Sequence, residues 1–170
     1  DGAEKYIVLI GEDPEITEKL SDIDLLVIDA EYFSPNDIAR LRENGIREIY
    51  SYINIGSIES FRSYDTDFEK YTLGAYENWP EEKWIDVSAP EWQACTASRV
   101  DSLVQKGVDG FFIDNCDVYY YAPKKDIFEG LTVILKNIRS LGKAVIINGG
   151  DTYVTAYQER YGSAEDIMTG

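Results

Sequence analysis

Short apolar runs alternate with stretches of helical periodicity along most of the chain. Five runs have the length and the β-branched composition of strands, over residues 6–10, 24–29, 47–54, 108–114 and 143–148. Between them, apolar positions recur at helical spacing, which predicts helices over residues 15–20, 35–43, 90–107, 124–141 and 151–161. Because the strand residues are apolar on both faces, the pattern predicts parallel strands that are buried on both sides.

Capping residues mark several of the predicted helix ends. Ser34-Pro35 supplies an N-cap followed by proline at the first helical position, and Asn44-Gly45 is a typical stop. Asp151 is expected to cap the last helix after the turn at Gly149-Gly150. Regular alternation of strands and helices, without a hairpin signal, indicates consecutive βαβ units.

One long segment interrupts this alternation between residues 55 and 88. It is rich in aromatic and acidic residues and contains Trp79 and Trp84. We expect the tryptophans to anchor the core or this loop. A loop of this length inside a compact domain is usually functional.

Two architectures fit consecutive βαβ units, a doubly wound sheet and a barrel. Length alone favours the doubly wound sheet, since a complete barrel takes about 250 residues and this chain has 170. The sequence after the first strand, Gly11-Glu-Asp-Pro14, places acids where a nucleotide phosphate would lie, which argues against a nucleotide-binding sheet. In favour of the barrel, four strands end in a polar residue, where barrel active sites lie: Asp29, Asn54, Asp114 and Asn148.

We therefore predict an α/β fold of the (β/α)8 TIM-barrel type, of which the chain supplies about the first five βα units. Residues 1–170 are expected to form a single domain that is incomplete at its C-terminus. The first residues, Asp1-Gly2-Ala3-Glu4, are compatible with a removed export signal, and hence with a secreted or cell-surface protein.

Charge and composition narrow the function. The net charge is −16, which argues against nucleic acid and anionic membranes as partners. The favoured interpretation of this charge is a solvated acidic surface, and the sharper alternative is a neutral or cationic substrate. No apolar run approaches the roughly 18 residues of a membrane span. The chain has no histidine, which excludes a Ser-His-Asp triad, a Cys-His pair and a histidine-ligated zinc. Acid–base chemistry then falls mainly to paired carboxylates.

The segment Asp114-Asn115-Cys116-Asp117 is the main candidate for chemistry. It follows an apolar strand, so burial is expected to raise the pKa of Asp114, and the nearby charge of Asp117 should raise it further. Asn115 can orient a carboxylate or bind a sugar hydroxyl. The rings of Tyr119, Tyr120 and Tyr121 can either stack on sugar faces or pack on the surface.

Other residues complete the predicted site. Tyr52 and Asn54 share a side-chain direction, and Asn54 is expected to open onto the top face of the barrel. Glu59 and Arg62 are predicted to pair, as a structural clamp of the loop more than as a substrate contact. Asp29 fits a capping and a functional role equally well.

Two further predictions concern Asn148 and the two cysteines. Beside Gly149-Gly150, Asn148 is predicted to contact a polar substrate. Cys95 and Cys116 are compatible with one disulfide bridge or with two buried thiols, the second being favoured.

Three motifs resemble glycoside hydrolase family 114, the endo-α-1,4-polygalactosaminidase-like family. They are Tyr52-Ile-Asn-Ile-Gly-Ser-Ile-Glu-Ser-Phe-Arg62, then Trp84-Ile-Asp-Val, then Gly107-Val-Asp-Gly-Phe-Phe-Ile-Asp-Asn-Cys-Asp-Val-Tyr119. The resemblance spans most of the chain in the order of the family, and the Asp-Asn-x-Asp-x-Tyr segment after a strand is its most specific element.

The resemblance implies a (β/α) barrel, an extracellular location and cleavage of α-1,4-linked galactosamine or N-acetylgalactosamine polysaccharide. It implies Asp114 as one catalytic carboxylate and a glutamate on a later strand, after Gly170, as its partner. No cofactor and no metal are predicted. The expected substrate-binding residues are Asp29, Tyr52, Asn54, Asn115, Asp117, Tyr119 and Asn148. The alternative is a non-catalytic carbohydrate-binding or cation-binding barrel, in which Asp29, Asp114, Asp117 and Asn148 supply oxygen ligands or sugar contacts.

Overall fold

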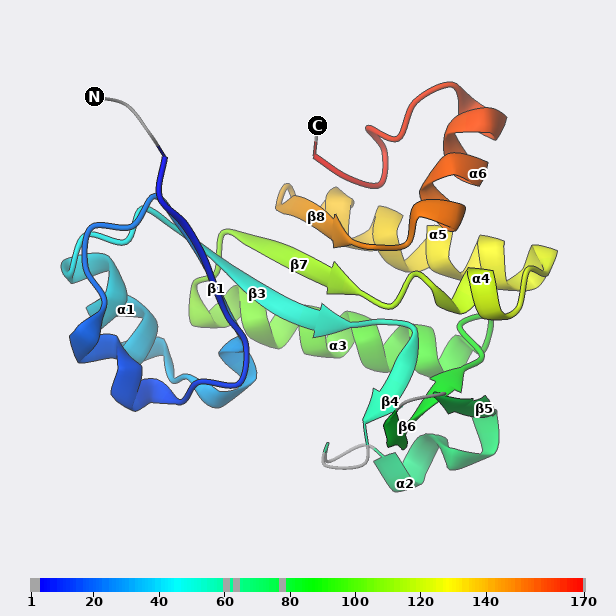
Figure 1. The fold of residues 1–170 in the computed structure, drawn as a ribbon, viewed down its shortest axis with the longest axis horizontal. Coiled ribbons are helices and arrows are strands. Elements are labelled where there is room, and N and C mark those ends of the chain that lie inside the picture. Colours follow the sequence, from blue (N-terminus) through cyan, green and yellow to red (C-terminus); the bar gives the residue numbers. More distant parts are fainter. Residues whose placement is uncertain (1–3, 60–61, 63–64, 77–78, 170) are drawn as a thin grey trace.

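The computed structural model describes residues 4–59, 62, 65–76 and 79–169. Five parallel strands form its central sheet, and each confirms a predicted strand to within a few residues (Figure 1). They lie in chain order, with each strand beside the next: β1 (Tyr6–Leu9), β2 (Leu25–Ile28), β3 (Glu48–Asn54), β7 (Gly110–Asp114) and β8 (Ala144–Asn148). This order favours a barrel, because the strand order of a doubly wound sheet reverses at a switch point.

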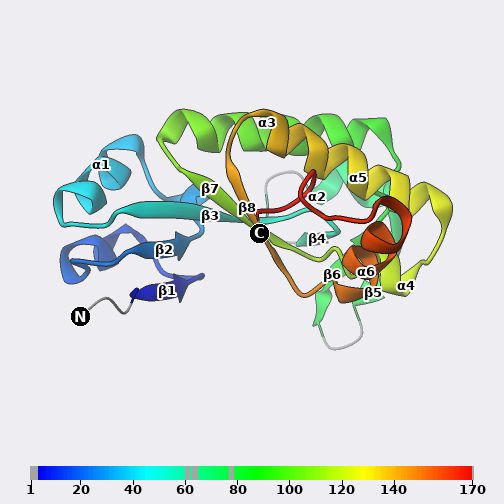
Figure 2. The same ribbon diagram turned by 90° about the horizontal axis from the view of Figure 1, so that it is seen from above.

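Helices follow the strands and gather on one face of the sheet. Figure 2 shows α1 (Pro35–Glu43), α3 (Pro90–Lys106) and α5 (Lys125–Ser140) on the same side of the strands. Short 3-10 turns, η1 (Pro14–Lys19) and η2 (Ala30–Tyr32), follow β1 and β2, and α4 (Val118–Tyr121) and α6 (Asp151–Tyr161) follow β7 and β8. Each crossover from strand to parallel strand thus carries helical structure, as βαβ units require.

The predicted helix ends are confirmed with one correction. Ser34 and Asp37 form a capping box at the start of α1, in which each side chain accepts a hydrogen bond from the other's backbone N–H. At α6 the N-cap is Gly150, with φ at 66°, and Asp151 is the first helical residue instead of the cap. The left-handed conformation needed there suits glycine.

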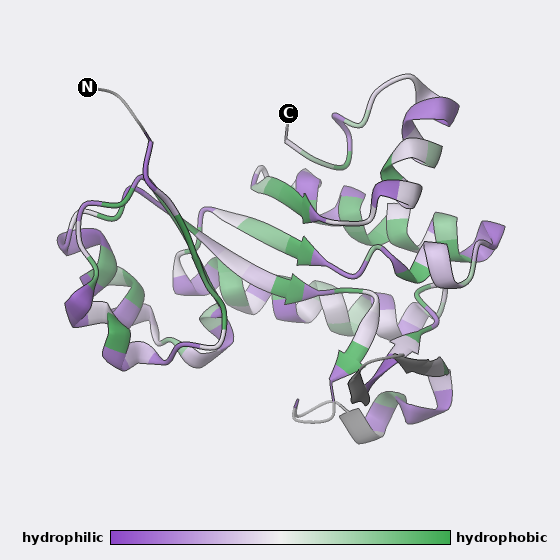
Figure 3. Ribbon diagram, in the orientation of Figure 1, coloured by the Kyte–Doolittle hydropathy of each residue, from purple (hydrophilic) through white to green (hydrophobic). Residues whose placement is uncertain are grey.

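The core lies between the sheet and its helices. The strands contribute fully buried residues such as Ile28, Ile53 and Ile113. On the facing side, α5 contributes its apolar stripe, and the alternation of apolar and polar residues along this helix is visible in Figure 3. The stripe consists of Ile127, Leu131, Ile134, Leu135 and Ile138.

The expectation that all strands are buried on both faces is wrong for β1. Its residues alternate between exposed and partly buried, and Tyr6 and Val8 are 49% and 39% exposed. Among the described strands, β1 pairs with β2 alone and forms an edge of the sheet. Its apolar residues therefore cover the helical side on one face and meet solvent on the other.

The segment expected to be a loop is instead a small antiparallel sheet with short helices. It contains β4 (Ser57–Glu59), α2 (Asp65–Phe68), η3 (Glu69–Tyr71), β5 (Thr72–Tyr76) and β6 (Trp79–Ile85), with the strands in the order β4-β6-β5. The prediction of no hairpin is thus wrong. This small sheet continues from the carboxyl end of β3, so it lies beside the end of the central sheet where a barrel site is expected (Figure 1).

Two of the tryptophans anchor the core as predicted, whereas the side chain of Trp79 lies outside the described part. Trp92 is fully buried and donates from Nε1 to the carbonyl oxygen of Ile55 at 3.0 Å, and Trp84 is 8% exposed. Cys95 and Cys116 are both free, which agrees with the favoured pair of buried thiols, although Cys95 is only partly buried. In the part of the chain that the structure describes, no helix has the length and apolarity to cross a membrane.

Candidate active site

Strand register sets three polar residues side by side at the carboxyl end of the sheet. Asn54 of β3 is paired with Asp114 of β7, and Asp114 is paired with Asn148 of β8. Asp29 follows β2 at the same end. All four polar strand ends therefore meet at one end of the sheet, as predicted from their positions after parallel strands.

Asp114 is held by three hydrogen-bond donors. Its Oδ1 accepts from the backbone N–H of Asn115 at 3.0 Å and from Nδ2 of Asn148 at 3.3 Å. Its Oδ2 lies 3.2 Å from the hydroxyl of Tyr52. The carboxylate is thus fixed in orientation from its own turn and from both neighbouring strands.

The electrostatic surroundings of Asp114 match the prediction. Burial raises the pKa of Asp114, and the charge of Asp117 raises it further. The hydrogen bonds from Asn148, Tyr52 and the backbone of Asn115 oppose this shift in the pKa. Asp114 is therefore a partly desolvated carboxylate that keeps donors to its charged form, a combination typical of catalytic groups.

Tyr52 joins Asp114 to a second carboxylate. Its hydroxyl lies 3.0 Å from Oε1 of Glu59 and 3.2 Å from Oδ2 of Asp114. Burial and the two negative charges raise the pKa of Tyr52 well above its ordinary value, so its hydroxyl keeps its proton. One hydroxyl hydrogen is thus shared between two acceptors.

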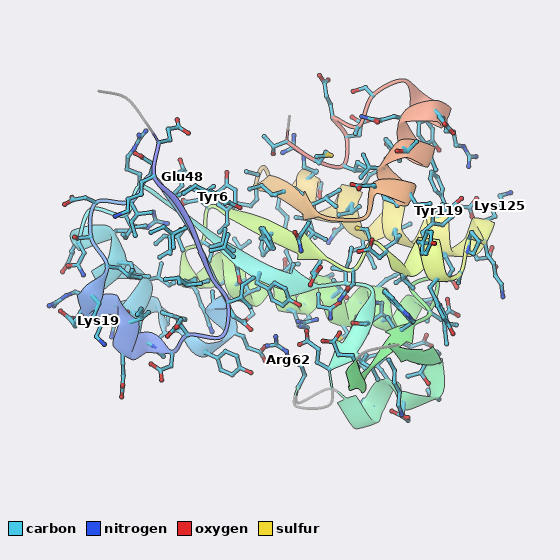
Figure 4. All side chains as sticks on the ribbon, in the orientation of Figure 1. Tyr6, Lys19, Glu48, Arg62, Tyr119 and Lys125 are labelled. Carbon is cyan, nitrogen blue, oxygen red and sulfur yellow. The ribbon has the colours of Figure 1, made fainter. Side chains whose placement is uncertain are left out.

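Glu59 in turn belongs to a buried ionic cluster around Arg62. Nε of Arg62 donates to Oε2 of Glu59 at 2.5 Å, one terminal nitrogen donates to Oδ2 of Asp29 at 2.9 Å, and the other is bonded to Glu31. The side chain of Arg62, labelled in Figure 4, is 3% exposed. We call Arg62, Asp29, Glu31 and Glu59 the arginine cluster. The predicted Glu59–Arg62 pair is confirmed, and Asp29 and Glu31 extend it to a cluster that was not predicted.

Asp29 serves this cluster and does not cap a helix. It precedes η2, but its side chain makes no capping hydrogen bond. Burial raises the pKa of Asp29, and the guanidinium of Arg62 opposes that rise. For Arg62 itself burial lowers the pKa, but the carboxylates of Asp29 and Glu59 outweigh this effect and raise it. Of the two roles predicted for Asp29, the structure therefore does not support capping.

Asn54 does not open onto the top face, contrary to the prediction. It is fully buried, and its Oδ1 accepts from the backbone N–H groups of Gly56 and Ser57. Its Nδ2 donates to Ser57 Oγ and Glu59 Oε1. Because these bonds use the whole amide, Asn54 shapes the turn from β3 to β4, and a direct substrate contact has no support in this geometry.

The turns after β3 and β7 pack tightly against each other. Asn115 is 3% exposed, has φ at 71°, and donates from Nδ2 to Ser57 Oγ at 3.1 Å. A Cβ atom at Gly56 would fall on the carbonyl oxygen of Asn115. Asn115 contacts Asp114 through its backbone N–H, whereas its side chain, expected to orient a carboxylate or to bind a sugar hydroxyl, is turned towards Ser57.

Asp117 and Tyr119 make no hydrogen bond to Asp114 among those of the described residues. Asp117 accepts from the backbone N–H of Gly150 at 3.0 Å and so ties the turn after β7 to the turn after β8. Tyr119, in α4, packs edge-to-face against Phe128 and Tyr153, and Figure 4 shows it well separated from Arg62. The structure therefore does not bring Tyr119 to Asp114, and the substrate contacts predicted for both residues stay predictions.

A cleft of about 700 Å³ opens beside Asp114, Tyr52 and Arg62. Its described lining is strongly acidic and includes the side chains of Glu12, Asp13, Asp29, Glu59, Glu82 and Asp114. Within the residues that the structure describes, no group of three or more histidine, cysteine, aspartate or glutamate side chains could hold a metal ion. In the arginine cluster, the guanidinium of Arg62 supplies the positive charge that pairs with the carboxylates.

Sequence reasoning missed two acidic residues of this site, Glu31 and Glu82. Glu82 is paired with Glu59 across β4 and β6 and accepts from Ser57 Oγ at 3.1 Å. Alternation along β6 would have placed Glu82 and Trp84 on one face, but only if the segment had been recognised as a strand. Glu31 is recruited by Arg62 from 31 residues away, and no local pattern signals that contact.

The arrangement can stabilise positive charge that develops in a bound substrate. Asp114 is partly desolvated, so its attraction for a nearby cationic carbon is stronger than in water. Its donors fix it before any substrate arrives, which avoids the cost of reorganisation. An acidic cleft leading to an oriented carboxylate also attracts ligands that carry positive charge.

Comparisons with solved structures show the same fold. The glycoside hydrolase domain of PelA from Pseudomonas aeruginosa matches with a TM-score of 0.73 and 20% identity, over 91% of this chain and 63% of that chain. Aspergillus fumigatus Ega3, solved in complex with galactosamine, matches with a TM-score of 0.71 and 21% identity, over 96% of this chain and 71% of that chain. The (β/α)-barrel type of fold predicted from the sequence is therefore confirmed.

The sequence comparisons match further proteins, and each of these matches covers a smaller share of both chains. A protein from Methanocaldococcus jannaschii is 29% identical over 114 residues, which are 59% of this chain and 30% of that protein. The chain spans about a third or less of the curated relatives that it matches. The sequence profile of the glycoside-hydrolase family GH114 matches residues 2–160. The chain belongs to glycoside hydrolase family GH114.

Proposed function

We propose that this protein hydrolyses an α-1,4-linked galactosamine or N-acetylgalactosamine polysaccharide by a two-carboxylate mechanism. Asp114 is the carboxylate that attacks or stabilises the anomeric carbon. The observation that carries the proposal is the geometry of Asp114, which ends β7, opens on the acidic cleft and accepts hydrogen bonds from its own turn and from both neighbouring strands.

The donors around Asp114 suit this role. Two of them bind Oδ1, while Oδ2 shares a single hydroxyl hydrogen of Tyr52 with Glu59. Oδ2 is therefore the less satisfied oxygen and the one better able to approach an electron-poor carbon. As glycosidic bond cleavage develops positive charge at the anomeric carbon, the partly buried carboxylate stabilises it.

The second carboxylate has to donate a proton to the leaving oxygen. Glu59 is linked to Asp114 through Tyr52, but it accepts hydrogen bonds from Arg62, Asn54 and Tyr52 and has no proton to donate in this arrangement. The resemblance implies a glutamate on a later strand, after Gly170, and that assignment stays a prediction. Its distance from Asp114 will separate retention, at about 5–5.5 Å, from inversion, at about 6.5–9.5 Å.

The substrate class rests on charge. A polymer with free amino groups is cationic near neutral pH, and both the cleft lining and the net charge of −16 favour its approach. The structural neighbour Ega3 was solved with galactosamine, which supports an amino sugar as the class of ligand. Because such polymers are extracellular, we also propose a secreted or cell-surface location.

Replacement of Asp114 by asparagine in the full-length protein tests the proposal. We expect Asp114→Asn to reduce the release of reducing sugar from α-1,4-galactosaminogalactan by at least about a thousandfold, because an amide cannot attack or balance a cationic carbon. Folding should be preserved, since the amide keeps the shape and part of the hydrogen bonding. Asp117→Asn is the matched control and should lose much less activity, because its carboxylate binds Gly150 and not Asp114.

Two outcomes would redirect the assignment. If Asp114→Asn keeps more than about a tenth of the wild-type rate, another carboxylate is the catalytic group. If the wild-type protein binds the polymer without releasing reducing ends, the non-catalytic carbohydrate-binding alternative replaces the hydrolase. The cation-binding form of that alternative is disfavoured at Asp29, because Arg62 already neutralises that carboxylate.

A further inference from the structure

A stacked aromatic pair joins α4 to the small sheet and has no part in holding Asp114. The ring of Tyr121, at the end of α4, stacks on the indole of Trp84 with centroids 5.6 Å apart and an interplanar angle of 19°. Trp84 is 8% exposed, whereas Tyr121 is 47% exposed. One face of the Tyr121 ring is therefore backed by the tryptophan, and the exposed area belongs to the rest of the ring.

The ring of Tyr121 is fixed in place as well as exposed. Its hydroxyl donates to the carbonyl oxygen of Leu73 in β5 at 3.4 Å. A Cβ atom at Gly74 would strike that hydroxyl, so the glycine leaves the room that the ring needs. An exposed aromatic ring held by stacking, by a hydrogen bond and by the shape of its surroundings loses little conformational entropy when a ligand covers it.

A short chain of contacts connects this ring to Asp114. Asn115, the residue after Asp114, donates to Ser57 Oγ at 3.1 Å, and Ser57 is the cross-strand partner of Trp84. Trp84 and the cleft-lining Glu82 lie two positions apart on β6 and so share a face of the small sheet. The tryptophan that backs Tyr121 therefore lies on the same face of the small sheet as a residue that lines the cleft.

The stacked pair lies on the side of Asp114 that faces away from β1. In Figures 1 and 2, α4 and the small sheet lie beyond the end of β7 on the side away from β1. The acidic residues after β1, Glu12 and Asp13, line the opposite part of the cleft. A chain of sugars that crossed the cleft past Asp114 would thus reach Tyr121 on leaving it.

We propose that Tyr121, backed by Trp84, is a stacking subsite for a pyranose ring of the polysaccharide, at a distance from the cleaved bond that only a long chain spans. This proposal rests on the proposed glycosidase function. The apolar C–H face of a pyranose matches the face of an aromatic ring, whereas the ring makes no demand on the hydroxyl pattern of the sugar. The subsite would therefore strengthen the binding of long chains without selecting the sugar that reacts.

Binding by catalytically silent protein isolates the subsite from the chemistry. Full-length Asp114→Asn protein is titrated calorimetrically with a short and with a long α-1,4-linked galactosamine oligosaccharide. Adding Tyr121→Ala should weaken the binding of the long oligosaccharide about tenfold and leave the short one unchanged. Tyr121→Phe should bind like the parent, because it keeps the ring and loses only the hydrogen bond to Leu73.

Tyr161 offers a matched control. It is 51% exposed and also contacts another ring, that of Tyr157, but it ends α6, which Figure 1 shows at the β8 edge of the central sheet and away from the small sheet. Tyr161→Ala should bind both oligosaccharides like the parent. Should Tyr121→Ala fail to fold, as judged by circular dichroism, Tyr121→Leu keeps apolar packing on Trp84 and is expected to show the same loss.

The outcomes separate the two proposals. If the parent binds the long oligosaccharide and the Tyr121→Ala or Tyr121→Leu protein binds it equally well, the subsite is refuted and the glycosidase proposal stands. An equal loss on the short and long oligosaccharides would also refute the subsite, because it would indicate a general disturbance of the cleft. If the parent binds neither oligosaccharide, the proposed substrate class fails, and the subsite fails with it.

Discussion

Removal of the cation from the arginine cluster should be among the most destabilising single changes in this protein. In Arg62→Met, the apolar stem is largely kept but the guanidinium is lost. The side chains of Asp29 and Glu59 are 6% and 4% exposed, so both would be left as buried carboxylates without their counter-ion. Breaking one buried pair costs about 3–5 kcal/mol, and here one arginine serves two buried partners and the more exposed Glu31.

We therefore expect a loss of at least about 3–5 kcal/mol in the free energy of unfolding, against a typical total of about 5–15 kcal/mol. Urea titrations followed by circular dichroism measure it. Arg40→Met is the control, because Arg40 pairs with Glu18 while their side chains are 52% and 65% exposed. That exposed pair should contribute only about 0–1 kcal/mol.

The loss should also depend on pH, with a sign that follows from Asp29. Burial already raises the pKa of Asp29, and Arg62 opposes that rise. Without Arg62 the pKa of Asp29 rises further, so folding takes up a proton and falling pH stabilises the variant. The difference from wild type should shrink between neutral pH and roughly pH 5. A loss below about 1 kcal/mol, or one independent of pH, would refute the view that buried carboxylates dominate the effect.

Two other changes test the surroundings of Asp114. Tyr52→Phe removes a hydrogen bond that lowers the pKa of Asp114, so this pKa should rise and the acidic limb of the activity profile should move to higher pH; an unmoved limb would show that the hydroxyl serves Glu59 alone. Gly56→Ala would place a methyl group on the carbonyl oxygen of Asn115, so we expect a loss of about 1–3 kcal/mol with reduced activity, measured by thermal melting and reducing-sugar release. An unchanged melting temperature would show that the two turns can separate at no cost.

Much of the fold could be predicted because its signals are local. The strand at 108–114 is a nearly continuous apolar run that follows Gly107, and α5 has a long periodic stripe that ends before Gly142. The small sheet could not be predicted in the same way. Its β5–β6 pairing contains register shifts, and β6 carries Pro80 and three charged residues, so the alternation that marks a strand is broken. Its strands are defined by pairing with one another more than by their own sequence.

The residues of the site also divide into those that have a local sequence signal and those that do not. Asp114 could be found because a carboxylate at the end of an apolar strand is a local feature, and the direction of its pKa shift followed from the residues around it. The prediction for Asn54 was wrong, since its exposure depended on the turn that folds back over it. The arginine cluster joins residues from β2, η2 and β4 through Arg62, and a spacing of three revealed only the Glu59–Arg62 pair.

The pairing of Asn54, Asp114 and Asn148 across three strands has a consequence for how the site comes into being. A slip of one residue between β3 and β7, or between β7 and β8, would turn the side chains of the slipped strand to the opposite face and leave Asp114 without one of its neighbours. These strands are joined through long crossovers, and such non-local pairings form late in folding. In a partly folded chain, Asp114 is therefore not held in its catalytic orientation. Hydrolytic activity would then indicate that the three strands are aligned correctly.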